Sequence, residues 1–194
     1  MKNSEEYYNK TKGNKPSGLL KTFFFMNFDK ELKGKTAIEL GAGAGNDAKY
    51  LLEKGFKVTC IDKEEKSKEI TMNQITKNEN LDFELQEFEK VKLHKADLIY
   101  SCFSLHFCNP EKFNDMMKEI IVSINTNGFF VGNFLGEEDD WNKNKKMTFL
   151  SKERMIEYFK DFEIKYLAEK KYVKGTVLEG KKNWHVFEII AMKK

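Results

Sequence analysis

Cysteine, histidine, arginine and long apolar runs are all scarce in this chain of 194 residues, and each scarcity excludes a class of protein. Cys60, Cys102 and Cys108 form no C-x-x-C pair, so we expect reduced thiols, as is usual in the cytoplasm. No apolar run approaches the roughly 20 residues that a membrane helix needs. The charged start, MKNSEEYYNK, lacks the apolar segment of a secretion signal. The sequence therefore predicts a cytoplasmic protein without a membrane segment.

The histidine and arginine content bears on metals and nucleic acids. His94, His106 and His185 are scattered and have no partners at the spacing of zinc ligands, so we expect no metal site. Arg154 is the only arginine among 34 basic residues, and the net charge is only +3. Because arginine supplies the commonest bidentate contact to guanine, we do not expect a nucleic acid partner.

The apolar patterns predict one domain, residues 18–194, preceded by a polar and mobile arm, residues 1–17. Helices are expected over 18–30, 46–54, 64–77, 110–124 and 151–160, and strands over 35–40, 56–61, 81–85, 96–101, 129–134, 162–173 and 184–192. This alternation predicts an α/β fold, a Rossmann-like three-layer sandwich around a mostly parallel seven-stranded sheet. No helix separates the last two strands, so we expect the last strand to be antiparallel.

A glycine-rich turn lies in AIELGAGAGNDAKYLLEKGFKVTCIDK, residues 37–63, between a buried strand and a helix. A P-loop is excluded because no Gly-Lys-Ser/Thr follows. The dinucleotide pattern is disfavoured, without being excluded, because Asn46 stands where its third glycine belongs. The chain matches G-x-G-x-G, as in sites for nucleoside sulfonium compounds; a plain strand-to-helix turn is the alternative. Asp62 ends the next strand, where a carboxylate can accept hydrogen bonds from two ribose hydroxyls or be an ordinary surface acid.

The ligand of such a sheet is expected beyond the carboxyl ends of its strands. The segments placed there are 40–47, 62–63, 86–89, 101–107 and 134–141.

Three ordered motifs between about residues 35 and 135 resemble those of class I S-adenosylmethionine-dependent methyltransferases. They are ELGAGAGNDAKYLLEKGFKVTCIDK, ELQEFEKV and ADLIYSCFSLHF. The run AKYLLEKGFKVTCIDK is particularly similar to the tellurite-resistance and small-molecule branches of that family. The resemblance implies that S-adenosylmethionine is the cofactor.

The resemblance also implies a role for individual residues. Glu39 would steady the methionine ammonium, Asp62 would take the ribose hydroxyls, and Ser101 would lie near the transferring methyl group. Glu87 would reach the adenine amine, with Phe88 clamping the base. The complete expected cofactor site is Glu39, Gly41, Ala42, Gly43, Asp62, Lys63, Glu87, Phe88 and Ser101.

The acceptor side of the site is less defined by sequence. His106 is the candidate general base, although a histidine there could also cap or pack. Phe103 and Trp141 are candidates for an acceptor pocket, or for packing. Tyr7 or Tyr8, in the arm, is expected to fold over the site as a lid; a loose end with its tyrosines packed elsewhere on the surface is the alternative.

The expected function is in-line methyl transfer from S-adenosylmethionine to a small-molecule acceptor. One alternative is a methyltransferase for tellurite or another chalcogen oxyanion. The other is a cofactor-binding module without catalysis, which the intact acids at 39, 62 and 87 disfavour.

Overall fold

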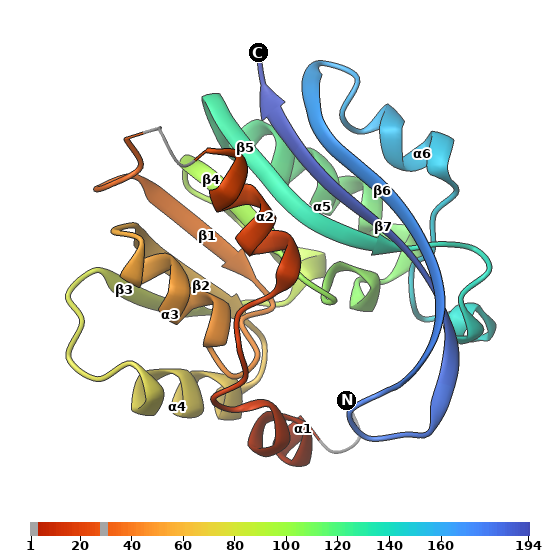
Figure 1. Cartoon of the computed structure of the whole chain (residues 1–194), viewed down its shortest axis with the longest axis horizontal. Helices are drawn as coiled ribbons and strands as arrows, with labels where there is room; N and C mark the ends of the chain where they lie inside the picture. Colours follow the sequence, from red (N-terminus) through yellow and green to blue (C-terminus); the bar gives the residue numbers. More distant parts are fainter. Residues whose placement is uncertain (1–3, 28–30) are drawn as a thin grey trace.

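The computed structural model describes residues 4–27 and 31–194, in which a mixed sheet of seven strands runs through the molecule (Figure 1). The strands are β1 (Thr36–Leu40), β2 (Lys57–Asp62), β3 (Leu81–Leu85), β4 (Ala96–Ser101), β5 (Ile124–Leu135), β6 (Phe162–Gly175) and β7 (Lys181–Lys193). Their spatial order is β3-β2-β1-β4-β5-β7-β6. The five strands β3, β2, β1, β4 and β5 are parallel to one another, whereas β7 is antiparallel to both β5 and β6. The predicted fold class is confirmed.

Helices cover both faces of this sheet. They are α1 (Ser4–Thr11), α2 (Gly18–Met26), α3 (Asn46–Glu53), α4 (Glu65–Gln74), α5 (Pro110–Ser123) and α6 (Lys152–Glu157), with short 3-10 helices η1 (Phe88–Lys90), η2 (Leu105–Phe107) and η3 (Asp140–Lys143). Across the described residues, none of the helices combines the length and the apolar character needed to cross a bilayer.

The three layers follow from the two-residue period of the strands. On β1, Ala37 packs into the core beneath α2 and α3, whereas Ile38 and Leu40 pack into the opposite core beneath α5 and α6. In Figure 1, α2 and α3 accordingly lie in front of the sheet and α5 lies behind it. Because both faces are covered, the central strands β1 and β4 are largely buried and mostly apolar.

Local capping fixes where the helices begin. The Asn109 side chain accepts a hydrogen bond from the Glu111 amide, and Pro110 occupies the first turn of α5. Ser151 caps α6 in the same way, by accepting from the Arg154 amide. Both starts agree with the sequence prediction.

Several predicted boundaries differ from the structure: α4 ends at Gln74 rather than 77, α6 ends at Glu157 rather than 160, and β7 begins at Lys181 rather than 184. Strand β5 begins at Ile124 rather than at 129, because Asn127 takes a left-handed conformation (φ +62°) within the strand instead of ending it. Helix α2 ends at Met26, where the Asn27 amide bonds to the Phe24 carbonyl. The remainder of the helix predicted to reach residue 30 falls outside the described residues.

The arm forms a regular element that the sequence did not predict. Residues 4–11 are helix α1, which contacts α4, and Tyr8 is buried against Ala44 and Ile70. Beyond α1, the Gly13 amide donates to Asn46 Oδ1 at 2.9 Å, and Asn46 Nδ2 donates to the Thr11 carbonyl at 2.9 Å. The arm is therefore tied to the first residue of α3. Residues 1–3 lie outside the described part of the chain.

The order of the strands reverses between β1 and β4, which are paired with Ile38 opposite Ile99. The connections that follow these two strands leave the sheet in opposite directions, which creates the usual ligand position of this architecture. The glycine-rich turn follows β1 at this point.

Candidate functional site

The three glycines of the turn all adopt left-handed backbone conformations, with φ values of +78° at Gly41, +58° at Gly43 and +77° at Gly45. A Cβ added to Gly41 would lie 2.3 Å from Ser104 Cβ, and one added to Gly45 would lie 2.7 Å from Thr71 Cγ2. A Cβ on Gly43 would meet no atom closer than 4.0 Å. Gly41 and Gly45 are thus required by internal packing, and Gly43 is the position where a ligand can approach the backbone.

Asp62, at the end of β2, holds the glycine turn in place. Its Oδ2 accepts a hydrogen bond from the Gly43 amide at 3.1 Å, and its Oδ1 accepts one from the Glu64 amide at 3.1 Å. Burial raises the pKa of Asp62, and the Gly43 amide partly opposes this shift. A carboxylate has about four lone-pair sites, so Asp62 keeps the capacity to accept from ribose hydroxyls.

Three carboxylates gather around this turn. Burial raises the pKa of Glu39, Asp47 and Asp62, and the charges of Asp47 and Asp62 raise that of Glu39 further, so that it lies well above its usual range. Among the described residues, none of the three forms an ion pair with a lysine or arginine at 4.0 Å or less. Such a site favours a cationic ligand.

Asp47 is the carboxylate that sequence analysis missed. It accepts hydrogen bonds from the Tyr100 hydroxyl at 2.5 Å and from the Ser17 amide at 2.7 Å. Its position in the first turn of α3, two residues after Gly45, is the sequence signal that could have identified it.

Ser101 lies at the carboxyl end of β4, and its hydroxyl is engaged within the protein, while its place near the transferring methyl group stays a prediction. Its hydroxyl is fully buried, donates to the Leu40 carbonyl at 3.1 Å and lies 2.5 Å from the Ser104 hydroxyl. Ser104 also donates to the Leu40 carbonyl, at 2.6 Å. These hydroxyls join the carboxyl ends of β1 and β4, so the Ser101 hydroxyl is already engaged within the protein.

The predicted adenine-binding residues lie after β3. Phe88 is half-buried, and its ring lies 3.5 Å from the position of a Cβ on Gly41. Glu87 and Lys63 are exposed, and Glu87 pairs with Lys90 at 2.8 Å. This pairing lowers the pKa of Glu87. Phe88 therefore lies beside the glycine turn, whereas the Glu87 head group is directed to solvent and Lys90.

The two tyrosines of α1 reach the same site. Burial raises the pKa of Tyr7, and the charges of Cys102, Asp47 and Asp62 raise it further. Burial also raises the pKa of Tyr8, with a contribution from Asp62. Tyr8 packs with Ala44 of the glycine turn, and Tyr7 packs against the same cluster, so α1 lies beside the turn. That α1 acts as a lid stays a prediction.

An aromatic cluster, defined as Phe103, Trp141, Tyr172 and Trp184, lies at the carboxyl edge beside β4 and β7. The Trp184 ring is the centre: its centroid lies 5.4 Å from that of Phe103, 5.3 Å from that of Trp141 and 6.3 Å from that of Tyr172. All four rings are partly exposed. Phe103 has a left-handed backbone (φ +51°), and its amide donates to Asn133 Oδ1 at 2.7 Å.

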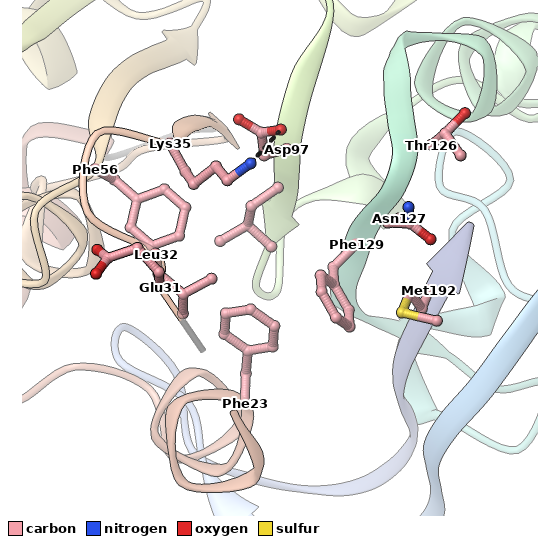
Figure 2. Close-up of a pocket in the computed structure, with 11 residues that line it drawn as sticks. Phe23, Glu31, Leu32, Lys35, Phe56, Asp97, Thr126, Asn127, Phe129 and Met192 are labelled. Atoms are coloured by element: carbon pink, nitrogen blue, oxygen red, sulfur yellow. Dashed lines mark ion pairs between the residues drawn. The ribbon is translucent and has the colours of Figure 1, made fainter. Parts of the chain in front are cut away.

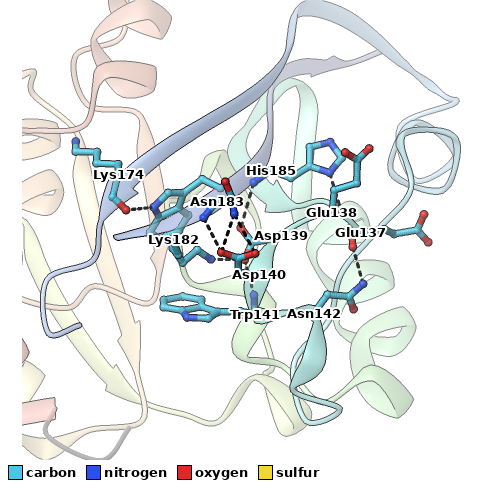
Figure 3. Close-up of polar contacts among 11 residues, drawn as sticks. Glu137, Glu138, Asp139, Asp140, Trp141, Asn142, Lys174, Lys182, Asn183 and His185 are labelled. Atoms are coloured by element: carbon cyan, nitrogen blue, oxygen red, sulfur yellow. Dashed lines mark hydrogen bonds and ion pairs between the residues drawn. The ribbon is translucent and has the colours of Figure 1, made fainter. Parts of the chain in front are cut away.

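A buried ion pair supports this cluster (Figure 3). The Lys182 ammonium lies 3.8 Å from the Trp141 ring centroid and 3.9 Å from that of Trp184, and it pairs with Asp139. Asp139 also accepts from the amides of Trp141 and His185, at 3.0 Å and 3.2 Å. Burial lowers the pKa of Lys182 although Asp139 opposes this. Nothing in the sequence signalled this pair, because its members are 43 residues apart.

His106 is buried next to the cluster, with its ring centroid 6.0 Å from that of Trp141. Its Nε2 is buried and has no hydrogen-bond partner among residues 4–27 and 31–194. Burial, with a smaller contribution from the Lys182 charge, lowers the pKa of His106 to about 3. A histidine with such a pKa is neutral at pH 7 and is a weak base, so it is poorly matched to the role of general base.

The structure therefore brings most predicted residues to one edge of the sheet. They are Glu39, Gly41, Ala42, Gly43, Asp62 and Phe88 around the glycine turn, with Tyr7 and Tyr8 above it and Phe103, His106 and Trp141 beside it. Within residues 4–27 and 31–194, no three His, Cys, Asp or Glu side chains are grouped so as to hold a metal ion.

A cavity of about 370 Å³ lies elsewhere, at the amino edge of the sheet (Figure 2). Phe23, Phe56 and Phe129 line it, and Lys35 pairs with Asp97 at 3.8 Å. The Thr36 amide donates to the Asp97 carboxylate at 3.0 Å, so Asp97 already has a structural partner. The cavity therefore lacks the carboxylates and the glycine turn that mark the carboxyl edge.

Comparison with known proteins agrees with this geometry. The family model described as tellurite resistance protein TehB matches residues 5–182 of the chain. A curated relative from Staphylococcus carnosus (strain TM300), described as an uncharacterized methyltransferase, is 29% identical over 92 residues, which are 47% of this chain and 42% of the relative.

Solved structures share the fold. TehB from Haemophilus influenzae has a TM-score of 0.77 at 19% identity, over 92% of this chain and 62% of that chain. Magnesium protoporphyrin IX methyltransferase (ChlM) from Synechocystis PCC 6803, solved with bound SAH, has a TM-score of 0.70 at 12% identity, over 98% and 94% of the two chains. The chain thus spans less than two thirds of the TehB structure and less than half of the curated relative.

The Asp139–Lys182 pair gives a test of the structure itself. Asp139→Asn leaves the buried Lys182 ammonium without a counter-charge, so we expect the free energy of unfolding to fall by about 3–5 kcal/mol. Asp140→Asn is the matched control, because the exposed Asp140 carboxylate accepts from the Asn183 amide and side chain and is not the ion-pair partner of Lys182. Its unfolding midpoint in urea, followed by circular dichroism, should stay close to that of the wild type. Equal midpoints for the two variants would contradict the buried pair.

Proposed function

The chain belongs to the TehB tellurite-resistance family, and on that premise we propose that it transfers the methyl group of S-adenosylmethionine to a small-molecule acceptor. The family match spans most of the chain, and the fold is that of solved methyltransferases. The observation that carries the proposal is the group of three carboxylates around the glycine turn.

The charges of the cofactor complement those of the site. S-adenosylmethionine carries an ammonium and a sulfonium, and the site offers Glu39, Asp47 and Asp62, none of which is paired with a lysine or arginine in the part of the chain that the structure describes. Two opposite charges 4 Å apart interact by about 4 kcal/mol at the effective dielectric of a protein surface. Glu39 and Asp47 would bind the methionine ammonium, and Asp62 the ribose.

The remaining contacts follow from the position of the turn. The Gly41–Gly43 backbone would contact the methionine and ribose, since Gly43 presents no side chain there. The Phe88 ring would pack against adenine, and the exposed Lys63 and Glu87 would flank its rim.

The reaction would be a direct in-line displacement. The acceptor lone pair forms the new bond to the methyl carbon as the carbon–sulfur bond breaks, and its electron pair returns to sulfur. The sulfonium charge disperses in this step, so alignment of donor and acceptor and exclusion of water supply most of the rate enhancement. The neutral His106 would provide a hydrogen bond and not act as a base.

Helix α1 would serve as the lid that excludes water. Tyr8 packs on Ala44 in the glycine turn, and the Gly13 and Thr11 contacts to Asn46 form the attachment beneath the helix. A segment attached at one end and packed through a few side chains at the other can open to admit a cofactor.

A chalcogen oxyanion such as tellurite is the second candidate acceptor, and the description of the matched family favours it. A module that binds the cofactor without catalysis is the third reading, and a methyl-transfer assay distinguishes it from the other two.

Cofactor binding tests the assignment. We expect calorimetry to show binding of S-adenosylmethionine and S-adenosylhomocysteine but not of NAD. Asp62→Asn removes a charge-assisted contact to ribose worth about 1.5–3 kcal/mol, so the affinity should fall more than tenfold. Asp82→Asn on the exposed face of β3 is the control and should bind normally. Preferential binding of NAD would overturn the assignment.

The raised pKa values predict how binding depends on pH. A cationic ligand favours the ionised form of Glu39, so its binding should release protons, and the affinity should rise as pH increases through the raised pKa of this group. In the unliganded protein, folded Glu39 holds its proton to higher pH than it does in the unfolded chain. Its contribution to the free energy of unfolding is therefore present at low pH and is lost as pH rises through the raised pKa. Calorimetry in buffers of different ionisation enthalpy measures the proton release. A release unchanged by Glu39→Gln would exclude Glu39 as its source.

Removal of the arm tests the lid. Deletion of residues 1–12 should loosen cofactor binding and lower turnover, because the buried Tyr8 contact and the cover over the carboxylates are lost. The sheet and the helices that cover it stay in the truncated protein, Asn46 and Asp47 included, so its thermal unfolding should remain cooperative. Full activity after truncation would show that the arm has no part in catalysis.

A further inference from the structure

We propose that Tyr100 is a positioning residue for cofactor binding, because its hydroxyl holds the Asp47 carboxylate in the orientation that receives the methionine ammonium of S-adenosylmethionine. This inference rests on the proposed function, in which Asp47 and Glu39 bind that ammonium. It adds a residue that the motifs of the chain did not indicate. The observations that carry it are the register of two strands, the two hydrogen bonds to Asp47 and the burial of the tyrosine ring.

The register of the sheet places Tyr100 directly beside Glu39. Strands β1 and β4 are parallel, and Glu39 on β1 is paired with Tyr100 on β4. Paired residues of neighbouring strands point to the same face of a sheet, which here is the face beneath α2 and α3. The tyrosine is fully buried, and Glu39 is 4% exposed. A tyrosine side chain is therefore packed next to the buried carboxylate at the carboxyl edge of the sheet.

The Tyr100 hydroxyl reaches from the sheet to α3. It donates to Asp47 Oδ2 at 2.5 Å, and the Ser17 amide donates to the other oxygen, Oδ1, at 2.7 Å. Asp47 thus has one donor on each carboxylate oxygen, one from β4 and one from the residue that caps α2. Hydrogen bonds to an ionised acceptor are shorter and stronger than those between neutral groups. Together the two donors fix the rotation of the Asp47 side chain.

Without these donors, the Asp47 carboxylate would favour solvent. Asp47 is half-buried in the first turn of α3, so a change of its side-chain rotamer can carry the charge into water. Burial of the charge and repulsion from the ionised Glu39 carboxylate both favour that change. Burial raises the pKa of Asp47, and the hydrogen bond from Tyr100 opposes this shift. The hydroxyl therefore keeps a charge in the site that would otherwise leave it.

Asp47 keeps the capacity to bind a ligand in this arrangement. A carboxylate has about four lone-pair sites, and the two hydrogen bonds occupy two of them. No lysine or arginine lies at ion-pair distance from Asp47 within residues 4–27 and 31–194, so the ammonium of the cofactor would be its counter-charge.

A tyrosine is suited to this position because it donates a hydrogen bond without bringing a positive charge. Burial raises the pKa of Tyr100 well above its usual range, so the hydroxyl keeps its proton and stays a donor. A lysine at the same place would neutralise the carboxylate and compete with the ligand. A phenylalanine would fill the same space and leave Asp47 free to turn away.

Tyr100→Phe tests the inference, because it removes one hydroxyl and keeps the buried ring. S-adenosylhomocysteine carries the ammonium, whereas 5′-methylthioadenosine has the same adenosine and thioether but lacks the amino acid part. In calorimetry, the affinity of Tyr100→Phe for S-adenosylhomocysteine should fall about tenfold, as expected for the loss of a hydrogen bond to a charged group. Its affinity for 5′-methylthioadenosine should stay that of the wild type.

Tyr158→Phe is the matched control. The Tyr158 hydroxyl donates to Asn114, and its ring packs against the core on the opposite face of the sheet. Its loss should leave both affinities unchanged. A general loss of packing would weaken both ligands, and thermal unfolding followed by circular dichroism measures that loss separately. A Tyr100→Phe protein that loses affinity for both ligands equally, or for neither, would overturn the positioning role.

A double-mutant cycle shows whether Tyr100 acts through Asp47. Asp47→Asn keeps the shape of the side chain and removes its charge, so it should weaken S-adenosylhomocysteine binding at least as much as Tyr100→Phe does. Tyr100→Phe added to Asp47→Asn should cause no further loss, because the contact that the hydroxyl supports is already gone. A second tenfold loss in the double variant would show that Tyr100 acts independently of Asp47, and the proposal would be wrong.

The outcomes separate this inference from the proposed function. If the wild type binds S-adenosylhomocysteine and Tyr100→Phe behaves as the control, only the role of Tyr100 is overturned. If the wild type binds neither S-adenosylmethionine nor S-adenosylhomocysteine, the proposed function is overturned and this inference with it.

Discussion

The junction between the carboxyl ends of β1 and β4 is the constraint on which the rest of the site depends. The Leu40 carbonyl accepts hydrogen bonds from Ser101 and Ser104, and Ser104 fills the space where Gly41 would otherwise carry a Cβ. This contact holds the loop after β4 against the glycine turn. It thereby fixes the start of the loop that carries Phe103 relative to the glycine turn.

The buried charges at this edge fall into two groups, one paired and one unpaired among the described residues. Lys182 and Asp139 neutralise each other between two indole rings, which gives a rigid support that joins η3 to β7. Glu39 and Asp47 have no lysine or arginine partner within ion-pair distance among the described residues, and burial raises the pKa of both. A paired charge stabilises the scaffold, whereas an unpaired one stores unfavourable energy that a cationic ligand relieves.

The predicted site residues differ in whether their side chains lie at the glycine turn, and the reason is physical. Glu39, Gly43 and Asp62 lie within or beside a single strand-turn-helix-strand unit, so local spacing was enough to place them together. Ser101 and Glu87 were assigned from motif position alone. The hydroxyl of Ser101 is taken by the Leu40 carbonyl, and the long side chain of Glu87 reaches Lys90 instead of the turn. A motif gives the position of a residue along the chain but not the hydrogen bonds that its side chain makes.

The sequence by itself determined the α/β class, the antiparallel last strand and the glycine turn with its following acid, because apolar period, caps and glycine conformations are local properties. It did not determine helix α1, whose order comes from burial of Tyr8 against Ala44 and Ile70. Nor did it determine the aromatic cluster or its supporting ion pair. These depend on strand order and register, which bring η3, β6, β7 and the loop after β4 together from distant parts of the chain. Only tertiary packing decides such contacts, since their energy comes from groups that the unfolded chain keeps apart.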